Sequence, residues 1–118
     1  MKKNILPNGF LSAGLSAGIK PDNSLDMALI VSDNIASAAG VFTTNQVYAA
    51  PVKLCKEHLV NNQAKAIIVN SGVANACTGK EGYNSAVEMT KETAKHLECN
   101  LTDVLVCSTG KICPQLPM

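Results

Sequence analysis

An apolar stretch at residues 66–69 is followed directly by a loop of small and polar residues, 70–79. This junction limits the fold classes that the chain can adopt. The stretch has the length and composition of a buried strand. A helical pattern follows at residues 84–98, and another buried strand is predicted at 104–107. This order predicts an α/β fold, in which the loops that follow strands commonly carry binding groups.

The helix predicted at residues 84–98 has two distinct sides. The side expected to face the core carries four residues at helical spacing: Val87, Thr90, Ala94 and Leu97. Two acidic and basic pairs are placed to support the solvated side: Glu88 with Lys91, and Glu92 with Lys95. A shorter helix is predicted from Pro51 to Leu59, with proline in its first turn.

The first part of the chain predicts short strands. Glycine and alanine are frequent in residues 7–20, which are expected to form a strand or hairpin that neighbouring chain approaches closely. A strand at residues 27–31 is expected to end at Asp33 and Asn34. Residues 38–42 predict a second strand that pairs antiparallel with it.

Length and charge limit the classes of function. The 118 residues and 12.4 kDa fit one domain, and a hydrophobic content of 47% excludes a disordered segment. The apolar runs are too interrupted to cross a membrane. Ten lysines against nine acidic residues give a net charge of +1, which favours neither nucleic acid nor anionic lipid as a partner.

Cysteine and histidine usage argues against a disulfide framework or a metal site. The five cysteines form no CxxC motif, and the opening MKKN lacks the apolar stretch of a secretory signal. A reducing cytoplasm is therefore expected, with the cysteines as small buried hydrophobic residues. His58 and His96 are each expected on an exposed helix surface rather than in a catalytic or metal site.

Common catalytic patterns do not fit the sequence. Gly72 and Gly79 are separated by six residues and Lys80 is followed by Glu81, which breaks the phosphate-loop pattern. The early glycines do not form a dinucleotide-binding fingerprint. The acidic residues around the strand at 27–31 are expected to cap or turn the backbone: Asp22, Asp26 and Asp33.

Two loops remain as candidates for chemistry, residues 70–79 and Ser108–Gly110. Both follow predicted strands, and both combine small residues with hydroxyl or amide groups that can donate to an oxygen. Such groups can form an oxyanion-binding site. The alternative is that serine, threonine, asparagine and glycine occur here only because they form turns readily.

Six short motifs follow one another along the chain. They are Gly9-Phe10-Leu11 with the Ala-Gly repeat after it, Ala39–Asn45, Ala49–Val52, Val69–Gly72, Ala74–Gly79 and Ser108–Gly110. In this order and spacing, from about Pro7 to Met118, they resemble the ornithine acetyltransferase (glutamate N-acetyltransferase) family of arginine biosynthesis.

The resemblance implies a layered α/β sandwich of the ornithine acetyltransferase type, of which residues 1–118 are the N-terminal part. It implies a cytoplasmic enzyme that moves an acetyl group from N-acetylornithine to glutamate, with no bound cofactor and with acetyl-CoA as a further donor in some members. Members cleave their own precursor before a threonine, whose freed amine and hydroxyl serve as base and nucleophile. Thr109 and Gly110 match the family's oxyanion-hole pair.

Several positions depart from the family's pattern. The cleavage site and catalytic threonine lie beyond the segment that matches Leu116-Pro117-Met118, so the 118-residue chain alone is not expected to turn over. The substituted positions are Val73, where many relatives have asparagine, Gln46, where a basic residue is common, and Lys111 and Cys113, where valine and glycine are usual. Lys111, beside the oxyanion pair, either assists or disturbs negative charge there.

The leading hypothesis is an N-terminal segment of an ornithine acetyltransferase. Its expected partners are the remainder of its own polypeptide or a cleaved second chain, its amino-acid substrates and, in the complete protein, further copies. One alternative is a degenerate, non-catalytic relative that keeps an amino-acid-binding or assembly surface, and another is a small-molecule binder unrelated to the family. A lone segment is expected to expose apolar surface and strand edges, and so to self-associate or partly unfold.

Overall fold

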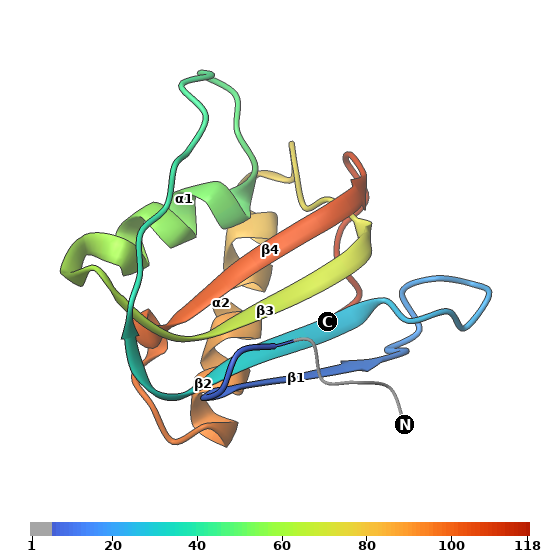
Figure 1. The fold of residues 1–118 in the computed structure, drawn as a ribbon. Helices are drawn as coiled ribbons and strands as arrows, with labels where there is room; N and C mark the ends of the chain where they lie inside the picture. Colours follow the sequence, from blue (N-terminus) through green and yellow to red (C-terminus); the bar gives the residue numbers. More distant parts are fainter. Residues whose placement is uncertain (1–5) are drawn as a thin grey trace.

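A computed structural model describes residues 6–118 and shows a four-stranded sheet with two helices packed on one face (Figure 1). The elements in chain order are β1 (Phe10–Leu15), β2 (Met27–Ser37), α1 (Ala50–His58), a 3₁₀ turn (Leu59–Asn61), β3 (Gln63–Val73), α2 (Gly79–His96), a second 3₁₀ turn (Leu101–Asp103) and β4 (Val104–Lys111). The prediction drawn from the opening MKKN lies outside the described residues. No helix within residues 6–118 has both the length and the apolar character that a membrane span needs.

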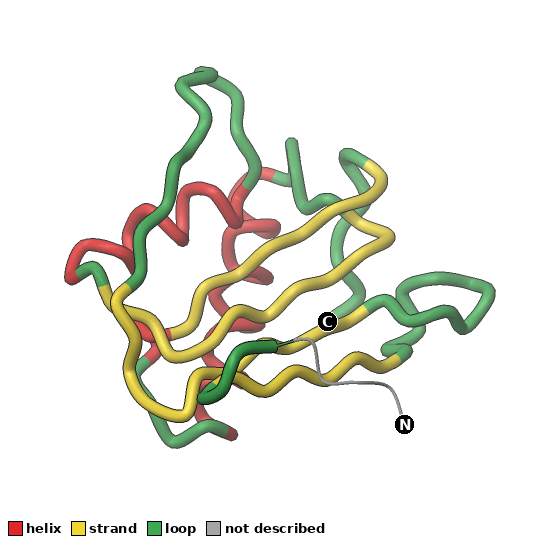
Figure 2. Tube along the Cα trace, in the orientation of Figure 1, coloured by secondary structure: helices red, strands yellow, loops and turns green. Residues whose placement is uncertain are grey.

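The sheet changes from antiparallel to parallel pairing along its width. Its order is β1-β2-β3-β4, with β2 antiparallel to both β1 and β3, and β4 parallel to β3. Helix α2 makes the crossover between the two parallel strands, and Figure 2 shows it, with α1, behind the sheet. Because β3 and β4 run in the same direction, their carboxyl ends lie at the same edge of the sheet.

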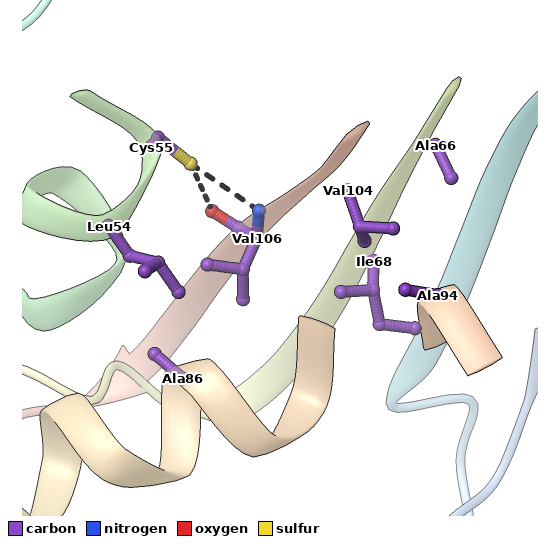
Figure 3. Close-up of a cluster of buried hydrophobic side chains, with 8 residues drawn as sticks. All are labelled: Leu54, Cys55, Ala66, Ile68, Ala86, Ala94, Val104 and Val106. Carbon is purple, nitrogen blue, oxygen red and sulfur yellow. Dashed lines mark hydrogen bonds between the residues drawn. The ribbon is translucent and has the colours of Figure 1, made fainter. Parts of the chain in front are cut away.

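The core lies between the helices and the sheet, and it is built from small aliphatic side chains (Figure 3). Four elements contribute two residues each to it: Leu54 and Cys55 from α1, Ala66 and Ile68 from β3, Ala86 and Ala94 from α2, and Val104 and Val106 from β4. Alternate residues of β3 and β4 face the helices, as strand geometry requires. The predicted core side of α2 is confirmed, since Thr90 and Ala94 are buried.

The opposite face of the sheet is not covered by any element within residues 6–118. Ile30, Ile67 and Leu105 lie side by side across β2, β3 and β4, and Val69 continues this row along β3. All four side chains are only partly buried. We call these four residues the open face of the sheet.

The predicted strand at residues 38–42 is wrong. The preceding strand β2 does not stop at Asp33 and Asn34 but passes through a bulge, where pairing shifts from Val31 opposite Ala66 to Ala36 opposite Ala64, and continues to Ser37. The next residues have no regular structure. The ring of Phe42 folds back over Gly40, where a Cβ would lie 2.7 Å from the ring, and Val41 is fully exposed.

Helix α2 begins at Gly79, earlier than the predicted residue 84. Gly82, in the added first turns, allows close packing, because a Cβ there would overlap the side chains of Asn75 and Thr78. Helix α1 agrees with its prediction, with Pro51 in its first turn. The predicted pairs on α2 are present, with Lys91 Nζ 3.2 Å from Glu88 and Lys95 Nζ 3.8 Å from Glu92.

His58 corrects the prediction that both histidines are exposed. It is buried at the end of α1, and its Nδ1 lies 2.8 Å from the carbonyl oxygen of Val104. His96, by contrast, is exposed. The ring of His58 therefore links α1 to the start of β4 and belongs to the core.

The cysteines are also only partly as predicted. Cys55 is buried, donates its thiol to Val106 O at 3.2 Å, and has a pKa raised by burial. Cys77, Cys107 and Cys113 are exposed, which contradicts the expectation of buried hydrophobic residues. The five thiols are all free.

Asp26 turns the backbone between β1 and β2, as predicted. Its carboxylate accepts N–H groups from Ala17, Ile19 and Lys20 at 2.6, 2.7 and 2.9 Å. These backbone bonds, that of Ala17 first, hold the pKa of Asp26 below its ordinary value. Its backbone carbonyl also accepts the Ser71 N–H at 2.8 Å, so the connection is tied to β3.

Candidate active site

The parallel pairing of β3 and β4 brings the two candidate loops together. Ser71 lies opposite Thr109, and Gly72 lies opposite Gly110. These residues are at the carboxyl ends of β3 and β4, which run side by side in the sheet (Figure 1). Ser108–Gly110 was predicted as a turn after a strand, but it forms the last part of β4 itself. The pair Thr109–Gly110 is therefore held by a sheet partner rather than by a free loop.

The backbone at Gly110 requires glycine. Its φ of +133° is in a region that other residues rarely adopt. A Cβ on Gly110 would overlap the carbonyl group of Gly72 and would lie 2.6 Å from Val73 N. Gly72 has a positive φ as well, +108°, so the two glycines let the strand ends approach each other.

A bulge in β3 shapes this contact. The pairing shifts between Gly72 and Val73, and Val73 lies opposite both Thr109 and Lys111. The Ala74 N–H then donates to Lys111 O at 2.9 Å. The bulge thus surrounds Gly110 with backbone of β3, and such bulges commonly reorient groups next to active sites.

Thr109 and Gly110 are both exposed, so a ligand can reach them. Within residues 6–118 the Thr109 hydroxyl has no hydrogen-bond partner and is free to donate to one. A hydroxyl and a neighbouring backbone N–H on a rigid strand end can together stabilise a developing negative charge on oxygen. Their role in an oxyanion hole stays a prediction.

The loop after β3 is internally bonded rather than open to a ligand. Asn75 is fully buried, donates its Nδ2 to Gly82 O at 2.8 Å and accepts the Thr78 hydroxyl at 2.7 Å. For Asn75 and Thr78 the interpretation as turn-forming residues therefore fits better than a ligand-binding role. Their bonds fix the loop on the N-terminus of α2.

Two of the four positions that depart from the family's pattern, Lys111 and Cys113, follow the pair within three residues. Cys113 has a φ of +82°, a conformation that favours glycine. Glycine is also the residue that the resemblance to the family implies at this position. Lys111 is exposed and makes no ion pair within residues 6–118. Throughout residues 6–118, no group of three histidine, cysteine or acidic side chains is placed to hold a metal ion.

The model of the ArgJ family matches residues 11–118. The chain belongs to this family. Arginine biosynthesis bifunctional protein ArgJ of Caldanaerobacter subterraneus is 51% identical over 113 residues, and its counterpart in Synechocystis is 48% identical over 113 residues. The matches cover 96% and 95% of this chain but only 28% and 27% of those proteins. The chain thus spans little more than a quarter of the length of these ArgJ relatives.

Two crystal structures of ArgJ relatives confirm the layered α/β fold. ArgJ from Bacillus halodurans has a TM-score of 0.90 at 42% identity, covering 94% of this chain and 58% of that one. Ornithine acetyltransferase from Mycobacterium tuberculosis, solved in complex with ornithine, has a TM-score of 0.86 at 43% identity, covering 95% of this chain and 61% of that one. The ArgJ match also sets aside a binder unrelated to the family.

The support beneath the Thr109–Gly110 pair does not follow from the sequence. Asn70 is fully buried and donates its Nδ2 to Val73 O at 2.8 Å, across the bulge. The sequence indicates this role only weakly, through an asparagine at the end of an apolar strand with a glycine two residues later. A strand prediction that ended at residue 69 could not place Asn70 inside the sheet.

Proposed function

We propose that this chain is the N-terminal part of a cytoplasmic acetyltransferase that moves an acetyl group from N-acetylornithine to glutamate in arginine biosynthesis. The rest of the polypeptide, intact or as a cleaved second chain, supplies the threonine nucleophile. The observation that supports the proposal most is the exposed Thr109–Gly110 pair on a rigid strand end, in a chain of the ArgJ family. The ornithine bound to the Mycobacterium tuberculosis relative is consistent with an amino-acid substrate.

In the proposed reaction a threonine hydroxyl attacks the acetyl carbonyl carbon of N-acetylornithine. The π electrons of the carbonyl move onto its oxygen, and the Thr109 hydroxyl and the Gly110 N–H donate to that oxyanion. The freed amine of the threonine takes the hydroxyl proton and passes it to the leaving nitrogen, so that collapse of the intermediate re-forms the carbonyl and expels ornithine with a neutral amine. The glutamate amine then attacks the acetyl-enzyme through a second oxyanion in the same place, which releases N-acetylglutamate and frees the threonine.

The pair suits this chemistry because it is fixed before the substrate arrives. Gly110 contacts the backbone of Gly72, and the sheet holds Thr109 opposite Ser71. Donors that need no reorganisation during the reaction contribute most to oxyanion stabilisation. Acetyl-CoA is a further acetyl donor in this proposal, and the complete protein is an oligomer.

The test uses the complete polypeptide of which this chain is a part. We expect ornithine and N-acetylglutamate to appear in equal amounts when it is given N-acetylornithine and glutamate. We also expect the isolated 118-residue chain to be inactive in the same assay. A complete, folded protein that transfers no acetyl group to glutamate would reject the proposal.

Lys111 and Cys113 favour one alternative, a non-catalytic relative that keeps the amino-acid site. Both stand beside the oxyanion pair and depart from the usual valine and glycine. Calorimetry on the complete protein distinguishes the two functions. Binding of ornithine and N-acetylornithine without acetyl transfer supports the alternative, and absence of binding by the folded protein removes it.

A further inference from the structure

Asn70 lies in β3 directly before the bulge that surrounds Gly110. Its side chain has no exposed surface, and its Nδ2 donates to Val73 O at 2.8 Å. This bond closes a ring over residues 70–73 and holds the Val73 peptide in the position from which it faces β4. The neighbouring positions on the same face of β3, Ala66 and Ile68, are filled by apolar side chains. The core therefore does not need a buried amide at position 70.

The position of Gly110 depends on the same bulge. Gly110 lies against the Gly72 carbonyl and Val73 N, and Val73 is the residue opposite both Thr109 and Lys111. A change in the orientation of the Val73 peptide therefore has to move the end of β4, because there is no free space between the two strands. The orientation of the Val73 peptide in the bulge therefore determines the direction in which the Gly110 N–H points.

The other half of the Asn70 amide has no partner, and neither has the hydroxyl of the residue beside it in the sheet. Asn70 Oδ1 and Ser108 Oγ are both buried and have no hydrogen-bond partner within residues 6–118. Asn70 and Ser108 are direct neighbours across the parallel pair. Because a buried polar atom without a partner is costly, the simplest arrangement has the Ser108 hydroxyl donating to Asn70 Oδ1, directly or through one water molecule.

We propose that Asn70 is a positioning residue for the oxyanion pair. Its Nδ2 fixes the bulge of β3, and its Oδ1 accepts a hydrogen bond from the Ser108 hydroxyl, directly or through one water molecule. The two interactions together set the direction of the Gly110 N–H and the Thr109 hydroxyl. The catalytic consequence rests on the proposed function, whereas the effect on the backbone does not.

The test compares two buried asparagines in the complete polypeptide. Asn70→Asp keeps the shape and the Oδ1 acceptor but places an oxygen, instead of the Nδ2 donor, against Val73 O. Asn75→Asp makes the same change at a fully buried amide that donates over the same 2.8 Å to Gly82 O, away from the bulge. We expect Asn70→Asp to lower kcat by about 10- to 100-fold with a KM for N-acetylornithine within about threefold of wild type, and Asn75→Asp to keep kcat within about threefold. An equal loss of kcat in both variants would overturn the proposal.

Hydrogen–deuterium exchange gives a readout that does not depend on activity. Asn70→Asp is expected to speed exchange in the peptide that contains residues 109–111, and Asn75→Asp to speed it at the start of α2 instead. If the complete protein transfers no acetyl group, the proposed function is rejected. The exchange pattern still tests whether Asn70 positions residues 109–111. Unchanged exchange at residues 109–111 in Asn70→Asp would reject that role.

Ser108 carries the test if Asn70→Asp does not fold. Ser108→Ala removes the hydroxyl that is proposed to bond Asn70 Oδ1, and we expect a fall in kcat of about 3- to 10-fold with faster exchange at residues 109–111. Ser108→Thr keeps a hydroxyl and is expected to restore most of the loss. Ser108→Ala with wild-type kcat and wild-type exchange would contradict the proposal.

Discussion

Gly110 lies so close to Gly72 that a Cβ on Gly110 would overlap the Gly72 carbonyl group. The two residues are far apart in the chain, yet they form one backbone contact at the end of the parallel pair. The contact makes glycine at position 110 a requirement of space as well as of backbone conformation, since its φ is +133°.

Gly110→Ala should therefore harm both stability and activity. The added methyl forces the strand ends apart, and we expect the free energy of unfolding to fall by about 1–3 kcal/mol. Displacement of the N–H is expected to lower kcat of the complete protein by about 10²- to 10³-fold. Gly9→Ala is the control, because Gly9 also has a positive φ, +88°, but no atom lies within 4 Å of its Cβ position. Steady-state kinetics with wild-type kcat for Gly110→Ala would contradict the assignment.

Thr109→Val removes a hydroxyl and keeps the size and branching of the side chain. The residue is exposed, so we expect little change in melting temperature. Loss of one oxyanion donor is expected to lower kcat by about 10²- to 10³-fold, and Thr109→Ser should keep much of the activity. Thr102→Val, at an exposed threonine in the 3₁₀ turn before β4, is the matched control. Equal kcat values for Thr109→Val and wild type would remove Thr109 from the site.

Elements with strong hydrophobic periodicity were predicted correctly from the sequence. The prediction was wrong where a residue type that is common in turns also occurs inside a strand or a helix. Helix α1, the core side of α2 and the strands β3 and β4 follow from patterns that packing also favours. Asp33 and Asn34 are ordinary turn residues, but here they lie in a bulge that lengthens β2, because pairing with β3 continues beyond them. Gly82 lies before the helix predicted at residues 84–98, but it is part of α2, where only glycine fits beside Thr78.

The site was predicted at the level of its two loops but not of its support. The small residues and the hydroxyl and amide groups of 70–79 and 108–110 predicted groups that can donate to an oxygen, and the parallel register brings the two segments to one edge of the sheet. Asn70 and His58 could not be placed, because burial of a polar side chain depends on its partner, and the partners are backbone carbonyls of Val73 and Val104. A single sequence carries no direct record of such contacts.

His58→Ala tests the structural role of the buried histidine. The substitution leaves a cavity at the end of α1 and removes the partner of Val104 O, so we expect a loss of about 1–3 kcal/mol in the free energy of unfolding. Activity per folded molecule should stay unchanged. His96→Ala, at an exposed position, should change stability by less than about 0.5 kcal/mol. A His58→Ala variant with wild-type melting temperature would show that the core does not depend on this ring.

Asp26 should make stability depend on pH in the acid range. Its pKa is lowered in the folded protein by the N–H groups of Ala17, Lys20 and Ile19, so the carboxylate stabilises the fold above the unfolded pKa of about 3.9. This contribution is lost as the pH falls from about 3.9 through the lower folded pKa. Melting temperatures measured from pH 7 to pH 2 should therefore decline less steeply for Asp26→Asn, which is less stable at neutral pH. Asp33→Asn is the control, and a wild-type profile for Asp26→Asn would contradict the role of these backbone bonds.

The 118-residue chain by itself should self-associate through the open face of the sheet. Ile67 lies at the centre of that face, between Ile30 and Leu105, and apolar faces of this kind are normally covered. We expect sedimentation velocity to show association that increases with concentration and that Ile67→Lys weakens. Val60→Lys, at a side chain that is 82% exposed outside the sheet, should leave the association unchanged. A monodisperse monomer at all concentrations would contradict the prediction.

The bulge in β3 has a consequence for anyone who wishes to transplant the Thr109–Gly110 pair into another scaffold. Copying Thr109 and Gly110 onto the end of a regular parallel strand would reproduce two residue types but not their geometry, because Gly110 takes its conformation from the neighbouring strand. The smallest portable unit is two strand ends from separate parts of the chain, one with Asn70–Val73 and one with Ser108–Lys111. In evolutionary terms, these two segments are expected to change together or not at all.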